Sequence, residues 1–170
     1  MKKYLMMIIG FIFVGCVKLP EGVEPVKNFE IDRYLGTWYE VARLDHIFEK
    51  GMSNVSAEYI KEGDKIKVIN RGYFERKKEW REAIGKAYFV DKSDVGFLKV
   101  SFFGPFYGSY IINELDEDYQ YALISGPNKG YLWILSRSKS LPKDIMDKLV
   151  GKASKLGFDT ETLIYVEQDK

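Results

Sequence analysis

The sequence predicts an all-β fold: an eight-stranded up-and-down antiparallel β-barrel with one C-terminal α-helix packed outside it. Three features of the chain predict this fold. A glycine and a tryptophan open a strand-like run that ends at Arg43, seven further strand-like runs follow between turn residues, and one helix-like stretch begins at Leu141. Short strands on short links favour an up-and-down barrel, because closing the sheet removes its unpaired edges.

The composition fits one folded domain. The chain has 170 residues, of which 46% are hydrophobic and 15% aromatic, enough to form a hydrophobic core. The formal net charge is only +1, and neutralising a nucleic acid backbone needs a strong excess of basic residues on one face. We therefore expect no nucleic acid partner.

The first 16 residues have the pattern of a bacterial lipoprotein leader. Lys2 and Lys3 precede an apolar run at 4–14, which is too short to cross a bilayer but fits the core of a secretory signal. Phe13-Val14-Gly15-Cys16 resembles a lipobox, in which a small residue precedes a cysteine that becomes lipidated. We expect a signal peptide at 1–15 and a lipid anchor on Cys16. A plain signal peptide or a short anchor with an incidental cysteine is the alternative.

Residues 16–27 carry Pro20, Gly22 and Pro25 without an apolar period, so they are expected to form a lipidated tether ahead of a domain at 28–170. Cys16 is the only cysteine, so no intramolecular disulfide can form. Val17 follows it, and by resemblance to lipoprotein sorting in two-membrane bacteria this favours the periplasmic face of the outer membrane.

A short helical turn at 29–35 is expected to cap the barrel before the first strand begins. The later strand-like runs lie between breakers such as Glu62-Gly63-Asp64 and Gly126-Pro127-Asn128. They are expected at 54–61, 65–74, 82–90, 97–103, 109–115, 120–125 and 131–136.

From Leu141 the apolar period becomes helical, and Gly157 ends the pattern. The apolar face of this helix comprises Ile145, Leu149, Ala153 and Leu156. Such a helix can lie against the outside of a barrel wall. A last strand at 162–167 is expected to pair alongside the first.

The run from Gly36 to Ala42, Gly-Thr-Trp-Tyr-Glu-Val-Ala, resembles the first signature of the lipocalins, in particular of the bacterial lipocalins. Strand ends alternate in an up-and-down barrel, so Trp38, the turn Asp118-Tyr119 and Arg137 share one end, where the family carries its three signatures. The resemblance implies an Arg137 guanidinium on the Trp38 indole and a turn held by Asp118 and Tyr119, although Glu117 stands where the family usually has threonine. It covers residue 28 to the C-terminus, and it implies that these motif residues are structural.

Alternation along the strands, with its phase set by Arg137, predicts the side chains that line the barrel interior. Small residues such as Gly72 and Gly85 are expected to leave space there, although the same side chains could instead fill a packed core. The Asn70 amide is expected to meet either a ligand carboxylate or an ordered water. Glu40 also points inward, which requires a partner or a bend in the first strand, because an unpaired buried carboxylate is costly. The residues expected to bind a ligand are Ala57, Tyr59, Asn70, Phe74, Ala87, Phe89, Val100, Phe102, Ile124, Tyr131 and Trp133.

The loops at the open end are expected to mix apolar and basic side chains, which suits contact with amphiphiles that carry an anionic head group. Solvated basic loops are the alternative. The residues concerned include Ile47, Phe48, Trp80, Arg81 and Phe106.

The resemblance implies a non-catalytic carrier of fatty acids or lysophospholipids, anchored in the membrane through Cys16 and used for membrane maintenance. It leaves a monomer and a homodimer open. No cofactor or metal is expected, because the only histidine, His46, lacks companion ligands at useful spacing. None of the side chains that the alternation places in the interior is a lysine or arginine, which argues against a siderophore-binding protein. Two alternatives are a structural envelope lipoprotein with a filled barrel and a lipid hydrolase using His46 with Asp45.

Overall fold

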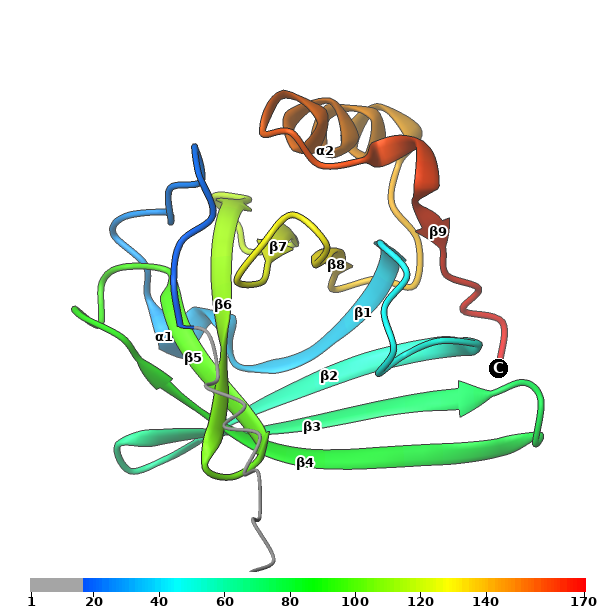
Figure 1. Ribbon diagram of the computed structural model, residues 1–170, viewed down its shortest axis with the longest axis horizontal. Coiled ribbons are helices and arrows are strands. Elements are labelled where there is room, and N and C mark those ends of the chain that lie inside the picture. Colours follow the sequence, from blue (N-terminus) through cyan, green and yellow to red (C-terminus); the bar gives the residue numbers. More distant parts are fainter. Residues whose placement is uncertain (1–16) are drawn as a thin grey trace, which may run out of the picture.

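The computed structural model describes residues 17–170, so the predicted signal peptide and Cys16 lie outside the described residues. Within that range the chain forms one antiparallel sheet with a long helix against its outer side (Figure 1). The strands are β1 Gly36–Arg43, β2 Met52–Glu62, β3 Lys65–Phe74, β4 Glu79–Phe89, β5 Phe97–Phe103, β6 Phe106–Leu115, β7 Tyr121–Ser125, β8 Leu132–Ser136 and β9 Ile164–Tyr165. The helices are α1 Ile31–Tyr34, α2 Lys143–Lys155 and the 3₁₀ helix η1 Thr160–Thr162.

The strands close into a barrel. β2 to β8 pair in chain order, β8 pairs with β1, and β1 pairs with β2. The predicted eight-stranded up-and-down barrel with one external helix is therefore confirmed. β9 joins β1 antiparallel at Ala42 and Arg43, but it covers only Ile164–Tyr165 of the predicted 162–167, and η1 takes up Thr162 at the start of that range.

Three strands begin earlier than their sequence pattern predicted, β2 by two residues and β4 and β6 by three each. β4 begins at Glu79, where Trp80 lies opposite Tyr73 with ring centroids 5.6 Å apart. β6 begins at Phe106, which lies opposite Phe103. Hairpin pairing between aromatic residues thus extends both strands into segments predicted as loops, so Trp80 and Phe106 stand on the wall of the barrel near its rim.

Strand β1 contains a bulge. Its register against β8 shifts between Glu40 and Ala42, so that Arg43 lies opposite Trp133 while Glu40 lies opposite Leu135. The extra residue returns Arg43 to the side of the strand that carries Glu40. Glu40 remains buried, and the partner that it required is Arg43, an unpredicted second charge that the bulge brings to the same side.

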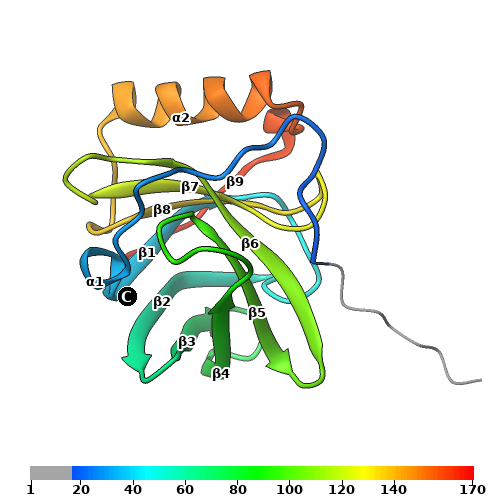
Figure 2. The same cartoon turned by 90° about the vertical axis from the view of Figure 1, so that its left-hand side faces the viewer.

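Helix α2 packs outside the barrel (Figure 2). Its buried residues are Leu149 and Ala153, with Ile145 and Leu156 partly buried beside them, which is the face predicted from the sequence. They pack against the outer side chains of β1, β6, β7 and β8, namely Val41, Ala42, Ile111, Leu123, Leu132 and Ile134. A second core cluster around Trp38 fills the closed end of the barrel.

Residues 17–27 run along the barrel instead of forming the free tether expected from their prolines and glycine (Figure 2). The Lys18 N–H donates to Ser109 Oγ at 2.8 Å, and the Val26 N–H donates to the Ile112 carbonyl at 2.8 Å. Val23 is buried against the wall beneath α2. None of the helices in residues 17–170 is long and apolar enough to cross a membrane.

Candidate functional site

The closed floor of the barrel is built on Trp38. Its indole is fully buried, its Nε1–H donates to the Tyr34 carbonyl at 2.8 Å, and the Tyr34 ring stacks on it with centroids 4.6 Å apart. The Arg137 guanidinium lies 4.1 Å from the centroid of the indole ring, the contact that the resemblance implied. These contacts join α1, β1 and the end of β8 into one plate.

Arg137 also fixes the backbone of the floor. Its guanidinium donates to the carbonyls of Thr37 and Arg33, each at 2.9 Å, and to that of Tyr119 at 3.3 Å. Gly36 has φ of +92°, and a Cβ there would lie 3.5 Å from Arg137. A glycine at this point therefore satisfies both the left-handed backbone and the close approach of the guanidinium.

The turn between β6 and β7 is held differently from the implied arrangement. Asp118 is exposed, and its carboxylate makes no hydrogen bond within residues 17–170; instead the Asp116 carboxylate accepts the Gln120 N–H at 3.2 Å. Tyr119 is buried, and its hydroxyl accepts the Glu30 N–H at 3.0 Å. The assignment of Asp118 as the turn-holding carboxylate is therefore wrong, and Asp116 takes that role.

Three tyrosines that the lumen pattern did not bring together meet above this floor. The Tyr110 hydroxyl lies 2.7 Å from that of Tyr34 and 2.8 Å from that of Tyr59. Burial, and then the neighbouring phenols, raise the pKa of Tyr110 well above its ordinary value. The phenols therefore remain protonated and form a neutral polar cluster at the bottom of the interior.

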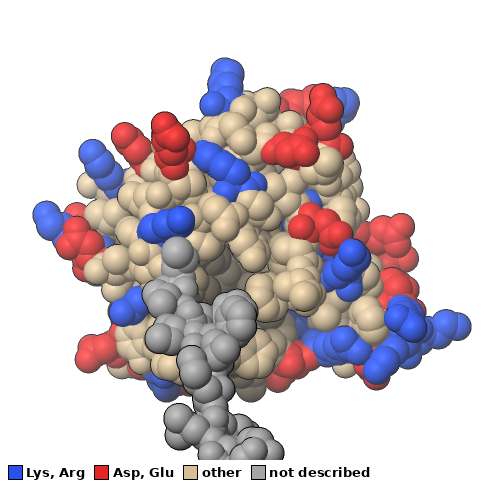
Figure 3. All heavy atoms as spheres, in the orientation of Figure 1, with Lys and Arg blue, Asp and Glu red and all other residues tan. Residues whose placement is uncertain are grey.

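Above the tyrosines most of the predicted lining residues keep some exposed surface. Of the predicted ligand-binding residues, Tyr59, Ala87 and Ile124 are buried in the packed floor cluster. The other eight are half-buried: Ala57, Asn70, Phe74, Phe89, Val100, Phe102, Tyr131 and Trp133. Figure 3 shows a hollow near the centre of this face, where Figure 1 looks into the ring of strands. We call the region lined by these eight residues the calyx.

Two glycines were expected to leave empty space in the calyx, but neighbouring groups occupy the space beside both of them. A Cβ on Gly72 would lie 3.0 Å from the Met52 sulfur, and one on Gly85 would lie 2.8 Å from the Phe102 ring. Neighbouring side chains thus fill the room that each glycine provides. The Asn70 side chain makes no hydrogen bond to any residue in 17–170 and is half-buried in the wall.

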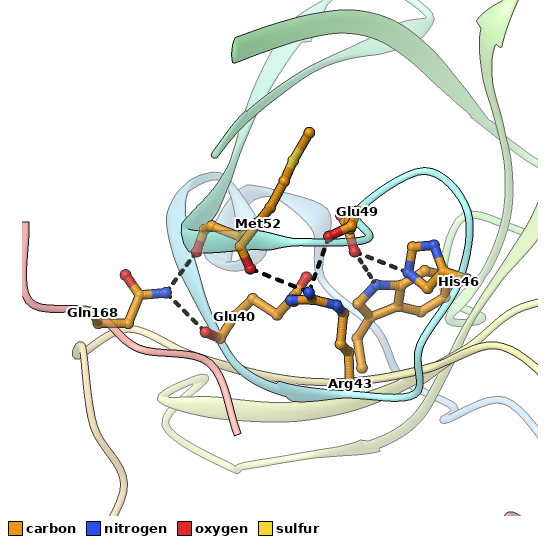
Figure 4. A network of polar contacts seen from close by, with 8 residues as sticks. Glu40, Arg43, His46, Glu49, Met52 and Gln168 are labelled. Carbon is orange, nitrogen blue, oxygen red and sulfur yellow. Dashed lines mark hydrogen bonds and ion pairs between the residues drawn. The ribbon is translucent and has the colours of Figure 1, made fainter. Parts of the chain in front are cut away.

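A buried polar network crosses β1 and the β1–β2 connection (Figure 4). Arg43, only 1% exposed, donates from Nη1 to Glu40 Oε1 at 2.8 Å and from Nη2 to the carbonyls of Glu49 and Met52 at 3.0 and 3.1 Å. The Gln168 amide donates to the Glu40 carbonyl at 2.8 Å and ties the C-terminal segment to β1. The expectation that no cation points inward is therefore wrong, because the bulge turns Arg43 to the lumen side.

His46 belongs to the same network. Its Nε2 lies 2.9 Å from Glu49 Oε2, which also accepts the Trp133 Nε1–H at 3.0 Å. Its ring is buried beside Tyr131 and Trp133, with centroids 5.7 and 5.1 Å away. Asp45 lies 3.8 Å from Lys50 instead, so the proposed pairing of His46 with Asp45 is wrong. Within residues 17–170 no hydroxyl donates to His46, so a hydrolytic nucleophile is missing beside it.

The two carboxyls of the network differ in charge. Burial, and then the nearby Glu49 carboxylate, raise the pKa of Glu40 well above its ordinary value. Burial also opposes ionisation of Glu49, but hydrogen bonding to His46 and to Trp133 lowers its pKa overall. The pKa values of the two carboxyls are therefore shifted in opposite directions, and Glu40 is the one whose protonated form burial favours.

Sequence reasoning missed Arg43, Glu49, Tyr34 and Tyr110. Alternation alone placed Arg43 outside, and nothing local marks a bulge after Glu40. Tyr34 and Tyr110 are large aromatic residues next to predicted core positions, but the contact between their hydroxyls depends on the register of β6. Among the described residues, no group of three or more side chains is arranged to hold a metal ion.

Comparison with known proteins gives consistent relatives. Residues 29–168 match a family model described as a lipocalin-like domain. The protein named outer membrane lipoprotein Blc in Vibrio cholerae is 54% identical over 170 residues, covering 99% of both chains. The protein of the same name in Escherichia coli K12 is 44% identical over 162 residues, covering 94% of this chain and 92% of that one.

Solved structures show the same fold at low identity. Insecticyanin from the tobacco hornworm Manduca sexta superposes with a TM-score of 0.72 at 22% identity, over 88% of this chain and 86% of its own. At that identity the likeness concerns the architecture alone.

Proposed function

The chain belongs to the lipocalin family, whose members are generally binding proteins rather than enzymes, and on this premise we propose that it carries fatty acids or lysophospholipids in its calyx. The carrier serves the maintenance of the membrane in which it is anchored. The observation that supports the proposal is the half-buried, largely apolar lining above a closed and tightly packed floor. A side chain left half-buried in an interior has surface to give to a guest, whereas a packed core has none.

The chemistry of this lining suits an acyl chain. Phe74, Val100 and Phe102 present aromatic and aliphatic surface, and Asn70 adds one amide that has no hydrogen-bond partner within residues 17–170. Each methylene removed from water contributes about 0.8 kcal/mol, so a long chain offsets the cost of ordering it and its host side chains. Arg43 makes its hydrogen bonds to Glu40 and to the carbonyls of the β1–β2 connection, and the Glu49 carboxylate accepts the Trp133 Nε1–H.

The relatives named outer membrane lipoproteins place this chain at the same membrane. We assign the anchor to Cys16, the cysteine of the lipobox-like stretch. Lys18, two residues later, is held against Ser109 of β6. At about 3.5 Å per extended residue, the barrel then lies close to the bilayer rather than at the end of a long tether.

A pair of adjacent phenylalanines offers the test. Phe102 is half-buried in the calyx, whereas Phe103 is 71% exposed on the rim. Delipidated full chain is offered oleic acid or 1-oleoyl-lysophosphatidylcholine, and uptake is read by native mass spectrometry. Phe102→Glu places a charge in the calyx and is expected to reduce uptake at least tenfold, while Phe103→Glu, the matched control, leaves it unchanged.

Two results would count against the proposal. Wild-type protein that takes up neither amphiphile would favour a filled barrel with a structural role. Equal losses from Phe102→Glu and Phe103→Glu would show that uptake occurs on the surface instead of in the calyx.

A further inference from the structure

A groove on the wall of the barrel has features that lipid burial does not explain. It has a volume of about 310 Å³ and lies where β3, β4 and β5 run together near the β5–β6 turn. Its lining combines basic and apolar groups: Glu62, Lys65, Lys67, Ile84, Gly85, Lys86, Ser101, Phe102 and Gly104.

Three hydrogen-bond donors form one row across this groove. Lys67 on β3 lies directly opposite Lys86 on β4, and Lys86 lies opposite Ser101 on β5. Side chains directly opposite on neighbouring strands point to the same face, and two like charges in that position destabilise the sheet. Neither lysine has an acidic partner within residues 17–170, since Glu62 lies 3.3 Å from Lys65. An anion placed between them would remove this repulsion.

The third member of the row is an unsatisfied buried hydroxyl. Ser101 is only 4% exposed, and its Oγ has no hydrogen-bond partner among the described residues. Leaving a buried hydroxyl unpaired costs about 1–3 kcal/mol, and such a group calls for a partner that the protein itself does not supply. Within this row, an oxygen-rich anion could accept from the Ser101 hydroxyl and from both ammonium groups.

The groove borders the calyx. The ladder between β4 and β5 ends at the pair Lys86 and Ser101, so β4 from Glu79 to Gly85 has no partner on β5. Just past that point the Phe102 ring covers Gly85 on the lumen side. Phe102 therefore lines both the calyx and the groove, and a molecule could lie on both sides of this edge.

We propose that the groove binds a phosphate group, and that the group belongs to the head of a lysophospholipid whose acyl chain occupies the calyx. The inference rests on the proposed lipid-carrier function and adds the head-group class and its binding residues. Lys67 and Lys86 supply charge, Ser101 donates a hydrogen bond, and Phe102 separates the head from the tail. Free phosphate carries the same chemistry without the tail and would bind only weakly.

A competition experiment tests this. Delipidated full chain receives an equimolar mixture of oleic acid and 1-oleoyl-lysophosphatidic acid, which share a tail but end in a carboxylate and a glycerol phosphate respectively. Native mass spectrometry gives the ratio of the two bound masses. The ratio refers to folded, loaded protein only, so it does not depend on the yield of a variant. Wild type should favour the lysophosphatidic acid. Replacing both lysines, Lys67→Gln with Lys86→Gln, should lower the ratio about tenfold, as expected for loss of charged hydrogen bonds.

Matched variants and a second probe separate the outcomes. Lys77→Gln with Lys78→Gln removes the same charge from the exposed β3–β4 turn and should leave the ratio unchanged, while Ser101→Ala should lower it by a smaller factor. Phosphorus NMR with inorganic phosphate should show only weak binding, lost in the Lys67 and Lys86 variant. An unchanged ratio in the Lys67 and Lys86 variant, or an equal fall in the turn variant, would show that the groove is not the phosphate site. Tight binding of inorganic phosphate without a preference between the two lipids would show that the bound phosphate is not a lipid head group. Failure of wild type to take up either lipid would instead overturn the carrier function.

Discussion

Glu40 and Glu49 lie in one buried network, yet neutralising them should have opposite effects on stability. Glu40→Gln keeps the shape of the side chain, and its amide oxygen can still accept from Arg43 Nη1, which lies 2.8 Å from Glu40 Oε1. Glu49→Gln removes the charge that accepts from Trp133 Nε1 and lies 2.9 Å from His46 Nε2. The comparison therefore asks which of the two carboxyls is ionised in the folded protein.

The expected pH dependence follows from the raised pKa of Glu40. In the unfolded chain this carboxyl ionises near its ordinary pKa of about 4.3, whereas folding raises its pKa, so the folded protein keeps the proton to a higher pH. The folded state is therefore favoured at low pH, and that advantage is lost as the pH rises from the unfolded pKa toward the folded one. The loss is about 1.4 kcal/mol for each pH unit in that window. Glu40→Gln abolishes this loss, so its stability relative to wild type should increase with pH and be equal or greater at pH 8.

Glu49→Gln should be destabilising by about 1.5–3 kcal/mol at pH 8, the range for hydrogen bonds to a charged group. The pKa of Glu49 is lowered, so its contribution is present above the unfolded pKa and is lost as the pH falls. Urea unfolding followed by circular dichroism at pH 5, 6, 7 and 8 measures both variants. Glu62→Gln serves as control, because among the described residues this exposed carboxylate pairs only with Lys65, and its loss should cost no more than about 0.5 kcal/mol.

A Glu40→Gln variant that loses as much stability at pH 8 as Glu49→Gln would refute the reasoning. It would show that Glu40 is ionised as the counter-ion of Arg43. The same conclusion would follow if the wild-type decline with pH persisted unchanged in the Glu40 variant.

Two further substitutions probe the wall and the floor by thermal or urea unfolding. Gly85→Ala should lower the free energy of unfolding by about 1–3 kcal/mol, because its Cβ would lie 2.7 Å from the Ser101 carbonyl. Gly108→Ala is the control and should be close to neutral, because a Cβ there would have no atom of the described residues within 4 Å. Equal effects of the two substitutions would show that β4 and β5 can move apart at this point. Arg137→Lys retains the charge but loses the planar guanidinium that donates to three carbonyls. We therefore expect the free energy of unfolding to fall by about 2–3 kcal/mol. A lysine variant as stable as wild type would show that the charge alone stabilises the floor.

The barrel itself was predictable from local pattern. Alternation and turn residues located every strand of the closed sheet, and the helical period placed Leu149 and Ala153 on the face of α2 that is buried. The limits of β4 and β6 were less predictable, since Trp80 and Phe106 join their strands only through pairing with Tyr73 and Phe103. Strand ends depend on cross-strand partners, which a single run of sequence does not contain.

The interior was predictable where alternation held and unpredictable where it failed. Val100, Phe102 and Trp133 are half-buried in the calyx as the phase from Arg137 predicted. Gly72 was expected to leave space that the Met52 side chain occupies, because the packing of a flexible neighbour is set by register and rotamer.

The sequence by itself determined the barrel, the external helix and the convergence of Trp38 with Arg137, because these follow from a two-residue or 3.6-residue period and from the order of strands. Only the tertiary structure decided that Arg43 faces inward beside Glu40, and that Lys67, Lys86 and Ser101 form one row. The physical reason is that a bulge shifts every later side chain by one position, and that the charge of a buried group depends on neighbours distant in the chain.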